Sequence, residues 1–334
     1  ERAAEATALA RFRKGLTTSL SGSFSRSMPS LSRSLSRSLS NPVAEEAEML
    51  KNWSPDNGAI EVVELEYRYR VDAPLVLQAV SFSFPPRSKT GLCGRTGSGK
   101  SSMLAALSRL HDVCGGKVLI DGVDVATVPL SRLRAAIAVI PQAPALFSGT
   151  VRFNVDPRGK TSDKDILAAL DEARLLRKFS AESILDTDVE EGGANWSTGE
   201  QQLLCLARAL VLKRRICALD EATANVDFET DAHIQKTLRE AAAFKEATLI
   251  VVAHRIRTIL DADQIVVLRD GMVLEQGSPA ELLAQDSSFA TMVKASNLDV
   301  DEATPPTPTA LGAAAVPVAW AQVVASASSF KEYE

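Results

Sequence analysis

Alternating and continuous runs of apolar residues occupy the middle of the chain and predict a series of β-strands. Residues 60–69 and 76–84 alternate apolar and polar positions, which is typical of strands with one buried face. The short apolar runs 90–93, 136–140, 216–219 and 248–253 are typical of fully buried strands. Asp121-Gly122 and Asp270-Gly271 each lie between two short apolar runs, so each predicts a hairpin.

Helices are predicted between these strands, where apolar residues recur every three or four positions. After the strand at 90–93, the apolar residues at this spacing are Met103, Leu104, Leu107 and Leu110. Further helices are expected over 162–179, 199–213 and 228–242, and a last one begins with a capping box at Ser278. Strands and helices that alternate in this way predict an α/β fold, with a parallel sheet covered by helices on both faces and antiparallel strands added by the hairpins.

Composition divides the chain into three parts. We expect an N-terminal segment over 1–54, one globular domain over 55–298 and a C-terminal tail over 299–334. Residues 19–40 are rich in Ser and Arg, and 32–40 repeat every four residues, which predicts a flexible linker. A regulatory alternative is that Ser36 and Ser40 are phosphorylated, since an arginine precedes each by three residues, and that residues 37–42 then bind a 14-3-3 type adaptor.

Bulk charge and cysteine content exclude several function classes. A formal net charge of −5 and a pI near 5.5 argue against a nucleic-acid binder that relies on a basic face. The four cysteines form no C-x-x-C pair and only three histidines are present, so we expect reduced thiols rather than a zinc site or disulfides. The best membrane-span candidate, 310–328, is Ala-rich and interrupted by Pro317 and Gln322. We interpret it as a tail helix or disorder, with a membrane span as the alternative. Because the chain begins at Glu1 rather than Met, we expect it to be a fragment, and any membrane role to come through a partner or a missing segment.

Residues 94–101, which follow the strand at 90–93, fit the phosphate-binding pattern G-x-x-x-x-G-K-[ST]. The loop joins a strand to a helix N-terminus, where free N–H groups and the positive end of the dipole favour an anion. Lys100 is expected to reach the β- and γ-phosphates, and the Ser101 hydroxyl to coordinate Mg²⁺. The residues expected to bind the phosphates are Gly94, Arg95, Thr96, Gly97, Ser98, Gly99, Lys100, Ser101 and Ser102.

Two adjacent carboxylates, Asp220 and Glu221, follow the apolar strand at 216–219. In an open α/β sheet, ligands bind at the carboxyl ends of the strands. Asp220 is therefore expected to hold Mg²⁺, directly or through water, and Glu221 to polarise an attacking water. Two adjacent acidic residues after an apolar run are also common on solvated turns. The functional interpretation of this pair therefore depends on the presence of the phosphate loop.

Together these motifs resemble the nucleotide-binding domain of an ATP-binding cassette transporter, most of all the second such domain of the C subfamily (multidrug-resistance-associated type). The resemblance covers most of 60–295. The residues that carry it stand at 68–70, 94–102, 140–142, 146–154, 202–210 and 219–224. It implies a P-loop NTPase with a RecA-like parallel core sheet, an antiparallel β subdomain and an inserted helical subdomain at about 151–200.

The same resemblance assigns roles to individual residues. Tyr69 would stack on adenine, and Gln142 would sense Mg²⁺ and water and link to the transmembrane partner. His254 would be the switch histidine that contacts the γ-phosphate, and Asp227 would end the D-loop. Without the resemblance, Tyr69 and His254 are ordinary residues of a strand and a strand end.

The signature motif departs from the family pattern L-S-G-G-Q. It is Trp196-Ser197-Thr198-Gly199-Glu200 here, so Ser197 and Gly199 are kept. These residues head a helix that would bind phosphate in the site of an opposite domain. Glu200 adds negative charge there, which should not help ATP binding, although an acid at a helix N-terminus also satisfies the dipole.

We therefore expect a Mg-ATP hydrolysing domain that powers export, at the cytoplasmic face of a membrane, with a second nucleotide-binding domain and transmembrane domains as partners and no nucleic acid. One alternative is a regulatory nucleotide-binding domain of a channel or receptor. Another is a soluble ABC ATPase without a transport role. The transported substrate lies outside what this chain encodes.

Overall fold

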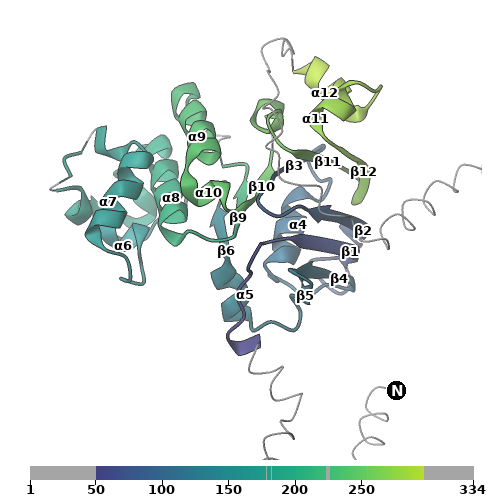
Figure 1. The fold of residues 1–334 in the computed structure, drawn as a ribbon, viewed down its shortest axis with the longest axis horizontal. Helices are drawn as coiled ribbons and strands as arrows, with labels where there is room; N and C mark the ends of the chain where they lie inside the picture. The colour runs from purple at the N-terminus through teal and green to yellow at the C-terminus, as the bar shows by residue number, and fades with distance from the viewer. Residues whose placement is uncertain (1–49, 178, 182, 223–225, 254, 297–334) are drawn as a thin grey trace, which may run out of the picture. The chain divides into compact units, whose positions relative to one another are not determined.

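A six-stranded sheet lies at the centre of the fold (Figure 1). The computed structural model describes residues 50–177, 179–181, 183–222, 226–253 and 255–296, and a compact unit separate from residues 1–53 begins at Ser54. The strand order is β12-β11-β3-β10-β9-β6. Its members are β3 (Lys89–Cys93), β6 (Ile137–Ile140), β9 (Ile216–Asp220), β10 (Thr248–Val252), β11 (Gln264–Arg269) and β12 (Met272–Gly277). All pairings are parallel except that of β12 with β11.

A second sheet is antiparallel and has the order β2-β1-β4-β5. Its strands are β1 (Ile60–Tyr67), β2 (Leu77–Phe84), β4 (Gly115–Ile120) and β5 (Val123–Asp124). Asp121 and Gly122 join β4 to β5 with φ of 49° and 79°, the left-handed values that an Asp-Gly hairpin turn requires. A small third sheet pairs β7 (Gly149–Thr150) with β8 (Asp188–Val189). The two hairpins predicted from Asp-Gly pairs are both confirmed.

The helices lie between and around the sheets. They are α4 (Lys100–Leu107), α5 (Leu130–Ala136), α6 (Val151–Val155), α7 (Asp163–Glu172), α8 (Thr198–Leu212), α9 (Phe228–Glu240), α10 (Ala242–Lys245), α11 (Pro279–Leu283) and α12 (Ser288–Ala295). Single 3-10 turns occur at η1 (Leu175–Arg177), η2 (Ile184–Asp186), η3 (Glu191–Gly193) and η4 (Ile256–Ile259). In Figure 1, α6, α7 and α8 gather at the end of the unit opposite to the antiparallel strands. This arrangement confirms the predicted α/β class, with a parallel core sheet, an antiparallel sheet and a group of helices.

Apolar burial explains why the central strands lie where they do. Strand β10 is buried at every position, and β9 at every position except Asp220. Side chains from α7, α8 and α9 extend the same core away from the sheet. Burial of this kind contributes roughly 25 cal/mol of folding free energy per Å² of apolar surface. It therefore stabilises the strands whose ends carry the polar residues.

One predicted helix differs from the structure. The pattern over 162–179 predicts a continuous helix, but α7 ends at Glu172. Arg174 has φ of 61°, a left-handed conformation that terminates helices, and η1 follows it. Apolar periodicity continued past the turn because Leu175 is buried in the same core. Helical spacing alone therefore did not reveal the break.

Several expectations concern residues that the structure does not describe. These are the linker with Ser36 and Ser40, most of the N-terminal segment, the tail with its span candidate, and His254. The domain boundaries also stay predictions. Within the described residues, the helices are too short or too polar to cross a membrane.

Candidate functional site

The loop between β3 and α4 has the backbone of a phosphate cradle. Gly94 has φ of 141°, and a Cβ there would lie 2.1 Å from the carbonyl oxygen of Leu268, so this position excludes any side chain. Gly99 caps α4 with φ of 105°, and a Cβ there would lie 2.6 Å from a methyl carbon of Leu77. The two constrained glycines thus shape the predicted loop, which connects a strand to a helix N-terminus.

The loop also holds polar groups that a phosphate would satisfy. The Lys100 side chain is buried, and its ammonium donates to the carbonyl oxygens of Gly94 (2.9 Å) and Arg95 (3.1 Å). Among the described residues it has no carboxylate within ion-pair distance. The hydroxyl of Ser98 is buried and has no hydrogen-bond partner within the described structure. A free cation and an orphaned hydroxyl in one glycine-rich loop fit a phosphate group.

Ser101 and Asp220 come together from two elements. The Ser101 hydroxyl, in the first turn of α4, donates to Asp220 Oδ1 at the end of β9 over 3.0 Å. Burial raises the pKa of the Asp220 carboxyl, and the neighbouring Glu221 acts in the same direction, while Ser101 and Lys100 oppose the shift. A hydroxyl and a carboxylate at this separation are oxygen ligands of the kind that Mg²⁺ prefers. The pair therefore fits the predicted magnesium site.

Glu221 meets Gln142 at the carboxyl ends of β9 and β6. The Gln142 amide donates to Glu221 Oε2 over 3.0 Å. Glu221 has φ of 47°, and its N–H donates to the carbonyl oxygen of Val252 on β10 (3.1 Å). A left-handed backbone is uncommon for a glutamate, and backbone strain of this kind clusters at active sites. The two residues are thus placed together, as their predicted roles require.

Tyr69 lies beside the phosphate loop. Its hydroxyl is 2.9 Å from the Ser102 hydroxyl in α4, and its ring stands edge-on to Tyr67 and His111 at 5.3 and 5.9 Å between centroids. These contacts fix the ring, yet 45% of the residue is exposed. A fixed aromatic face open to solvent next to a phosphate loop is suited to stacking with a base.

The signature residues head α8 and form a second group. Ser197 is the N-cap, and its hydroxyl accepts from the Glu200 N–H. The Glu200 carboxylate in return accepts from the Ser197 N–H (2.9 Å) and from the Ser197 hydroxyl (2.6 Å). Glu200 thus completes a capping box, and its carboxylate accepts the hydrogen bond that the Ser197 hydroxyl can donate. The departure at Trp196 has a packing role: its indole is buried, lies 4.9 Å from the Phe179 ring between centroids, and donates to the carbonyl oxygen of Asp188.

Asp227 joins the signature group rather than the phosphate loop. It is the N-cap of α9, where it accepts from the Thr230 N–H and hydroxyl, and these bonds hold the pKa of its carboxyl below its usual range. Ser197, Gly199, Glu200 and Asp227 line one cavity of about 290 Å³. None of the phosphate-loop residues is among the residues that line it. Those predicted site residues that the structure describes thus fall into two groups, one at the phosphate loop and one at the signature.

Gln202, which had no predicted role, links the segment that carries Gln142 to the segment that carries Glu221. It is buried in α8, and its amide donates to the carbonyl oxygens of Ala222 (2.6 Å) and Pro141 (3.0 Å). Pro141 precedes Gln142, and Ala222 follows Glu221. One side chain of the signature helix therefore ties together the two segments that carry Gln142 and Glu221. The available signal is that this polar residue shares the buried face of α8 with Leu206 and Ala209.

The comparisons with known proteins agree with this geometry. Residues 77–224 match the family model described as ABC transporter. This domain belongs to the ABC transporter family. The chain is 45% identical over 248 residues to ABC transporter C family member 13 of Oryza sativa subsp. indica. This match covers 74% of this chain and 16% of the relative.

Two further relatives and a solved structure support the assignment. ATP-binding cassette sub-family C member 2 of Rattus norvegicus is 44% identical over 246 residues (73% of this chain, 16% of the relative). Sub-family C member 8 of Homo sapiens is 45% identical over 247 residues (73% and 15%). A bacterial Atm1-family ABC exporter, solved with ATP bound, is 33% identical with a TM-score of 0.68, over 74% of this chain and 43% of the exporter chain.

The similarity is therefore to an ATPase domain of C-subfamily ABC transporters. The chain spans about a sixth of the length of these curated relatives. The ABC domain carries the phosphate loop, Asp220, Glu221 and Gln142 in one group and the signature in the other. His254 and residues 223–225 lie outside the described residues, so the role of the histidine stays a prediction.

Proposed function

We propose that this chain binds Mg-ATP at the phosphate loop and hydrolyses it, and that hydrolysis powers transmembrane export. The observation that carries the proposal is the meeting of Ser101 with Asp220 and of Gln142 with Glu221 at the carboxyl edge of the parallel sheet. Catalysis of phosphoryl transfer depends mainly on positioning and on electrostatic stabilisation. These four side chains, with Lys100, supply both.

Each residue has a role that follows from its place. The Lys100 ammonium turns from the loop carbonyls to the phosphates, and Tyr69 stacks on the adenine. Ser101, Asp220 and Gln142 would hold Mg²⁺, which when bound neutralises phosphate charge. Glu221 accepts a proton from the attacking water, and the Gln142 amide keeps its carboxylate in place. His254 contacts the γ-phosphate.

Hydrolysis requires a second nucleotide-binding domain. Ser197 and Gly199 lie in a group of their own within this chain, so they act on nucleotide held by a partner domain, while the phosphate loop here receives the signature of that partner. Transmembrane domains complete the transporter, and the chain works at the cytoplasmic face of the membrane. The Ser/Arg-rich segment with Ser36 and Ser40 is a phosphorylation-dependent adaptor site in this proposal.

Two substitutions in the chain test the proposal. Glu221→Gln is expected to keep ATP affinity and to lose at least about 100-fold in turnover, because the proton acceptor is gone. Lys100→Ala is expected to weaken ATP binding itself. Binding is followed with a fluorescent ATP analogue and turnover by phosphate release, at a protein concentration that allows two copies to pair. Glu61→Gln on β1 is the control. Near-normal turnover in Glu221→Gln removes this residue from the role and overturns the proposed mechanism.

A further inference from the structure

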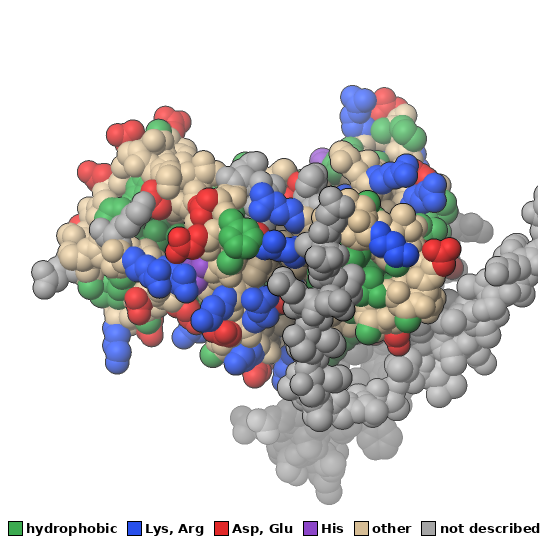
Figure 2. All heavy atoms as spheres, turned by 90° about the horizontal axis from the view of Figure 1, so that it is seen from above, with side chains coloured by type: hydrophobic (Ala, Val, Ile, Leu, Met, Phe, Trp, Pro, Cys, Tyr) green, Lys and Arg blue, Asp and Glu red, His purple; other side chains and the backbone are tan. Residues whose placement is uncertain are grey.

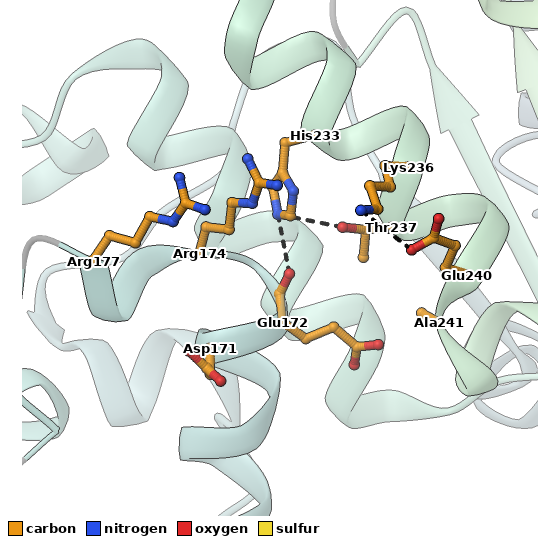
Figure 3. Close-up of a pocket in the computed structure, with 9 residues that line it drawn as sticks. All are labelled: Asp171, Glu172, Arg174, Arg177, His233, Lys236, Thr237, Glu240 and Ala241. Carbon is orange, nitrogen blue, oxygen red and sulfur yellow. Dashed lines mark hydrogen bonds and ion pairs between the residues drawn. The ribbon is translucent and has the colours of Figure 1, made fainter.

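A cavity of about 320 Å³ lies between the end of α7 and helix α9, away from the phosphate loop (Figure 3). Asp171, Glu172, Arg174 and Arg177 line it from α7 and the turn after it. His233, Lys236, Thr237 and Glu240 line it from α9, and Ala241 from the position just after that helix. Arg174, Arg177 and His233 also line the neighbouring cavity that contains the signature residues. The basic residues thus lie where the two cavities meet.

His233 is the buried polar side chain of this cavity. It is 8% exposed, and its Nε2–H donates to the Glu172 carbonyl oxygen at the end of α7 (3.0 Å), with the Thr237 hydroxyl at 3.3 Å. The other ring nitrogen, Nδ1, is buried and has no partner among the described residues. Buried polar atoms are nearly always paired in folded proteins. Because His233 lines the cavity, its orphaned ring nitrogen points to a ligand that is bound beside it.

Three cations surround this histidine. Burial lowers the pKa of His233, and Arg174, Arg177 and Lys236 act in the same direction. Arg174 and Arg177 have no carboxylate within ion-pair distance in the part of the chain that is described, whereas Lys236 is 3.7 Å from Glu240. Figure 3 shows both guanidinium groups at the level of the imidazole and the Asp171 carboxyl below it. Figure 2 shows Lys and Arg side chains interspersed with Asp and Glu on the face that it presents.

We propose that Arg174, Arg177 and His233 form a binding site for a small phosphate-type oxyanion, with Lys236 at its edge. Two planar guanidinium groups, joined by the imidazole when its Nδ1 is protonated, offer several N–H donors, which suits a tetrahedral group with several acceptor oxygens better than a carboxylate with two. The left-handed turn at Arg174 makes this possible, because it ends α7 and leads the chain directly into η1, which carries Arg177. The volume admits a phosphate ester of a small molecule as well as the free ion.

Binding at this site is coupled to protonation. Nε2 already donates to Glu172, so an anion at Nδ1 favours the doubly protonated, charged ring. The charged groups that face His233 are Asp171, Glu172, Arg174 and Arg177 from α7 and its turn, Lys236, Glu240 and Glu229 from α9, Asp227 at the start of α9 and Glu200 from α8. Histidine is the side chain whose charge ordinarily changes between pH 5 and 8. Anion affinity is therefore expected to rise as the pH falls over this range.

The test follows the imidazole of His233 by NMR in the full 334-residue chain. The chain has three histidines, and His233→Gln identifies the signal by its loss. Sulfate is the first probe, because its charge is constant between pH 5 and 8. Saturable binding at millimolar concentration or tighter is expected, with an increase of about one unit in the pKa of His233 and about tenfold tighter binding at pH 5.5 than at pH 8.

Two double variants separate this site from the phosphate loop, which also binds anions. Arg174→Gln/Arg177→Gln is expected to weaken sulfate binding at His233 at least about tenfold. The control Lys117→Gln/Arg132→Gln removes two cations from β4 and α5 and leaves binding unchanged. Inorganic phosphate and glycerol 3-phosphate then identify the source: tighter binding of the ester indicates a phosphorylated small molecule, and equal binding indicates the free ion. A His233 signal that does not respond to about 20 mM sulfate, or that responds equally without the two arginines, overturns the proposal.

Discussion

The Gln142 amide donates to the Glu221 carboxylate over 3.0 Å and joins the carboxyl ends of β6 and β9. The two residues are far apart in the sequence, and their strands pair directly in the parallel sheet, with Ile140 opposite Leu219. The bond holds the Glu221 carboxylate in place at the edge of the sheet where nucleotide is proposed to bind.

Removal of this bond is predicted to lower turnover more than binding. Gln142→Ala leaves Glu221 without its orienting partner, and a misplaced catalytic group typically costs tenfold or more in rate. We expect turnover to fall about tenfold to 100-fold while ATP affinity changes about twofold or less. Phosphate release and nucleotide titration measure the two quantities. Gln276→Ala on β12 is the control, and an equal loss of binding and turnover contradicts the orienting role.

Gln202 is predicted to stabilise the two segments that carry Gln142 and Glu221. Its amide donates to the buried carbonyl oxygen of Ala222 and the part-buried one of Pro141, so Gln202→Leu leaves both acceptors without this donor. An unpaired buried polar group costs about 1–3 kcal/mol. We expect the free energy of unfolding in urea to fall by about this amount, and turnover to fall as well because the segments that carry Gln142 and Glu221 separate. A variant with full stability and full activity shows that the link is dispensable.

The sequence predicted the parts of this fold that depend on local pattern and missed those that depend on packing. Gly94, Gly99 and Lys100 follow from the spacing of one loop, and Asp220 from its place after an apolar strand. The end of α7 was missed because Leu175 continues the apolar period beyond a left-handed Arg174. Gln202 and His233 were missed because each looks like an ordinary polar residue in a helix until its partners on other elements are known.

The capping box at the signature predicts that Glu200 weakens the composite site. Its carboxylate holds the Ser197 hydroxyl at 2.6 Å and places negative charge where a phosphate would bind. Glu200→Gln keeps the capping box, since glutamine serves equally in this position. In a Glu221→Gln background, we expect ATP-dependent association of two copies to strengthen about fivefold, equivalent to about 1 kcal/mol, which is the repulsion of two like charges about 4 Å apart in water.

Analytical ultracentrifugation with and without ATP measures this association. Glu281 occupies the same position in the capping box of α11, where its carboxylate accepts from the Ser278 N–H. Glu281→Gln is therefore a matched control and should leave association unchanged. If Glu200→Gln behaves like this control, the charge at the signature has no effect on nucleotide.

A buried ion pair between Lys89 and Asp261 predicts how the fold responds to substitution. Lys89 Nζ lies 2.6 Å from Asp261 Oδ1, and Arg239 donates to the other oxygen at 2.9 Å. The Lys89 side chain is only 8% exposed. Asp261→Asn leaves the buried ammonium without its carboxylate, and such a change costs about 3 kcal/mol of unfolding free energy. Lys89→Met is expected to cost less, because Asp261 keeps Arg239. A double-mutant cycle in urea should give a coupling of about 1–3 kcal/mol.

The same pair sets a pH dependence with a definite sign. Burial opposes the charge of Asp261, but Lys89 and Arg239 keep the pKa of its carboxyl below its usual range. A carboxyl whose pKa is lowered by folding contributes stability that is present above its unfolded pKa of about 3.9 and is lost as the pH falls through the folded value. The stability difference between the native chain and Asp261→Asn should therefore be full at pH 7 and shrink below about pH 4. Urea unfolding across this range measures it, and a difference that stays constant down to the acid limit contradicts the role assigned to this carboxylate.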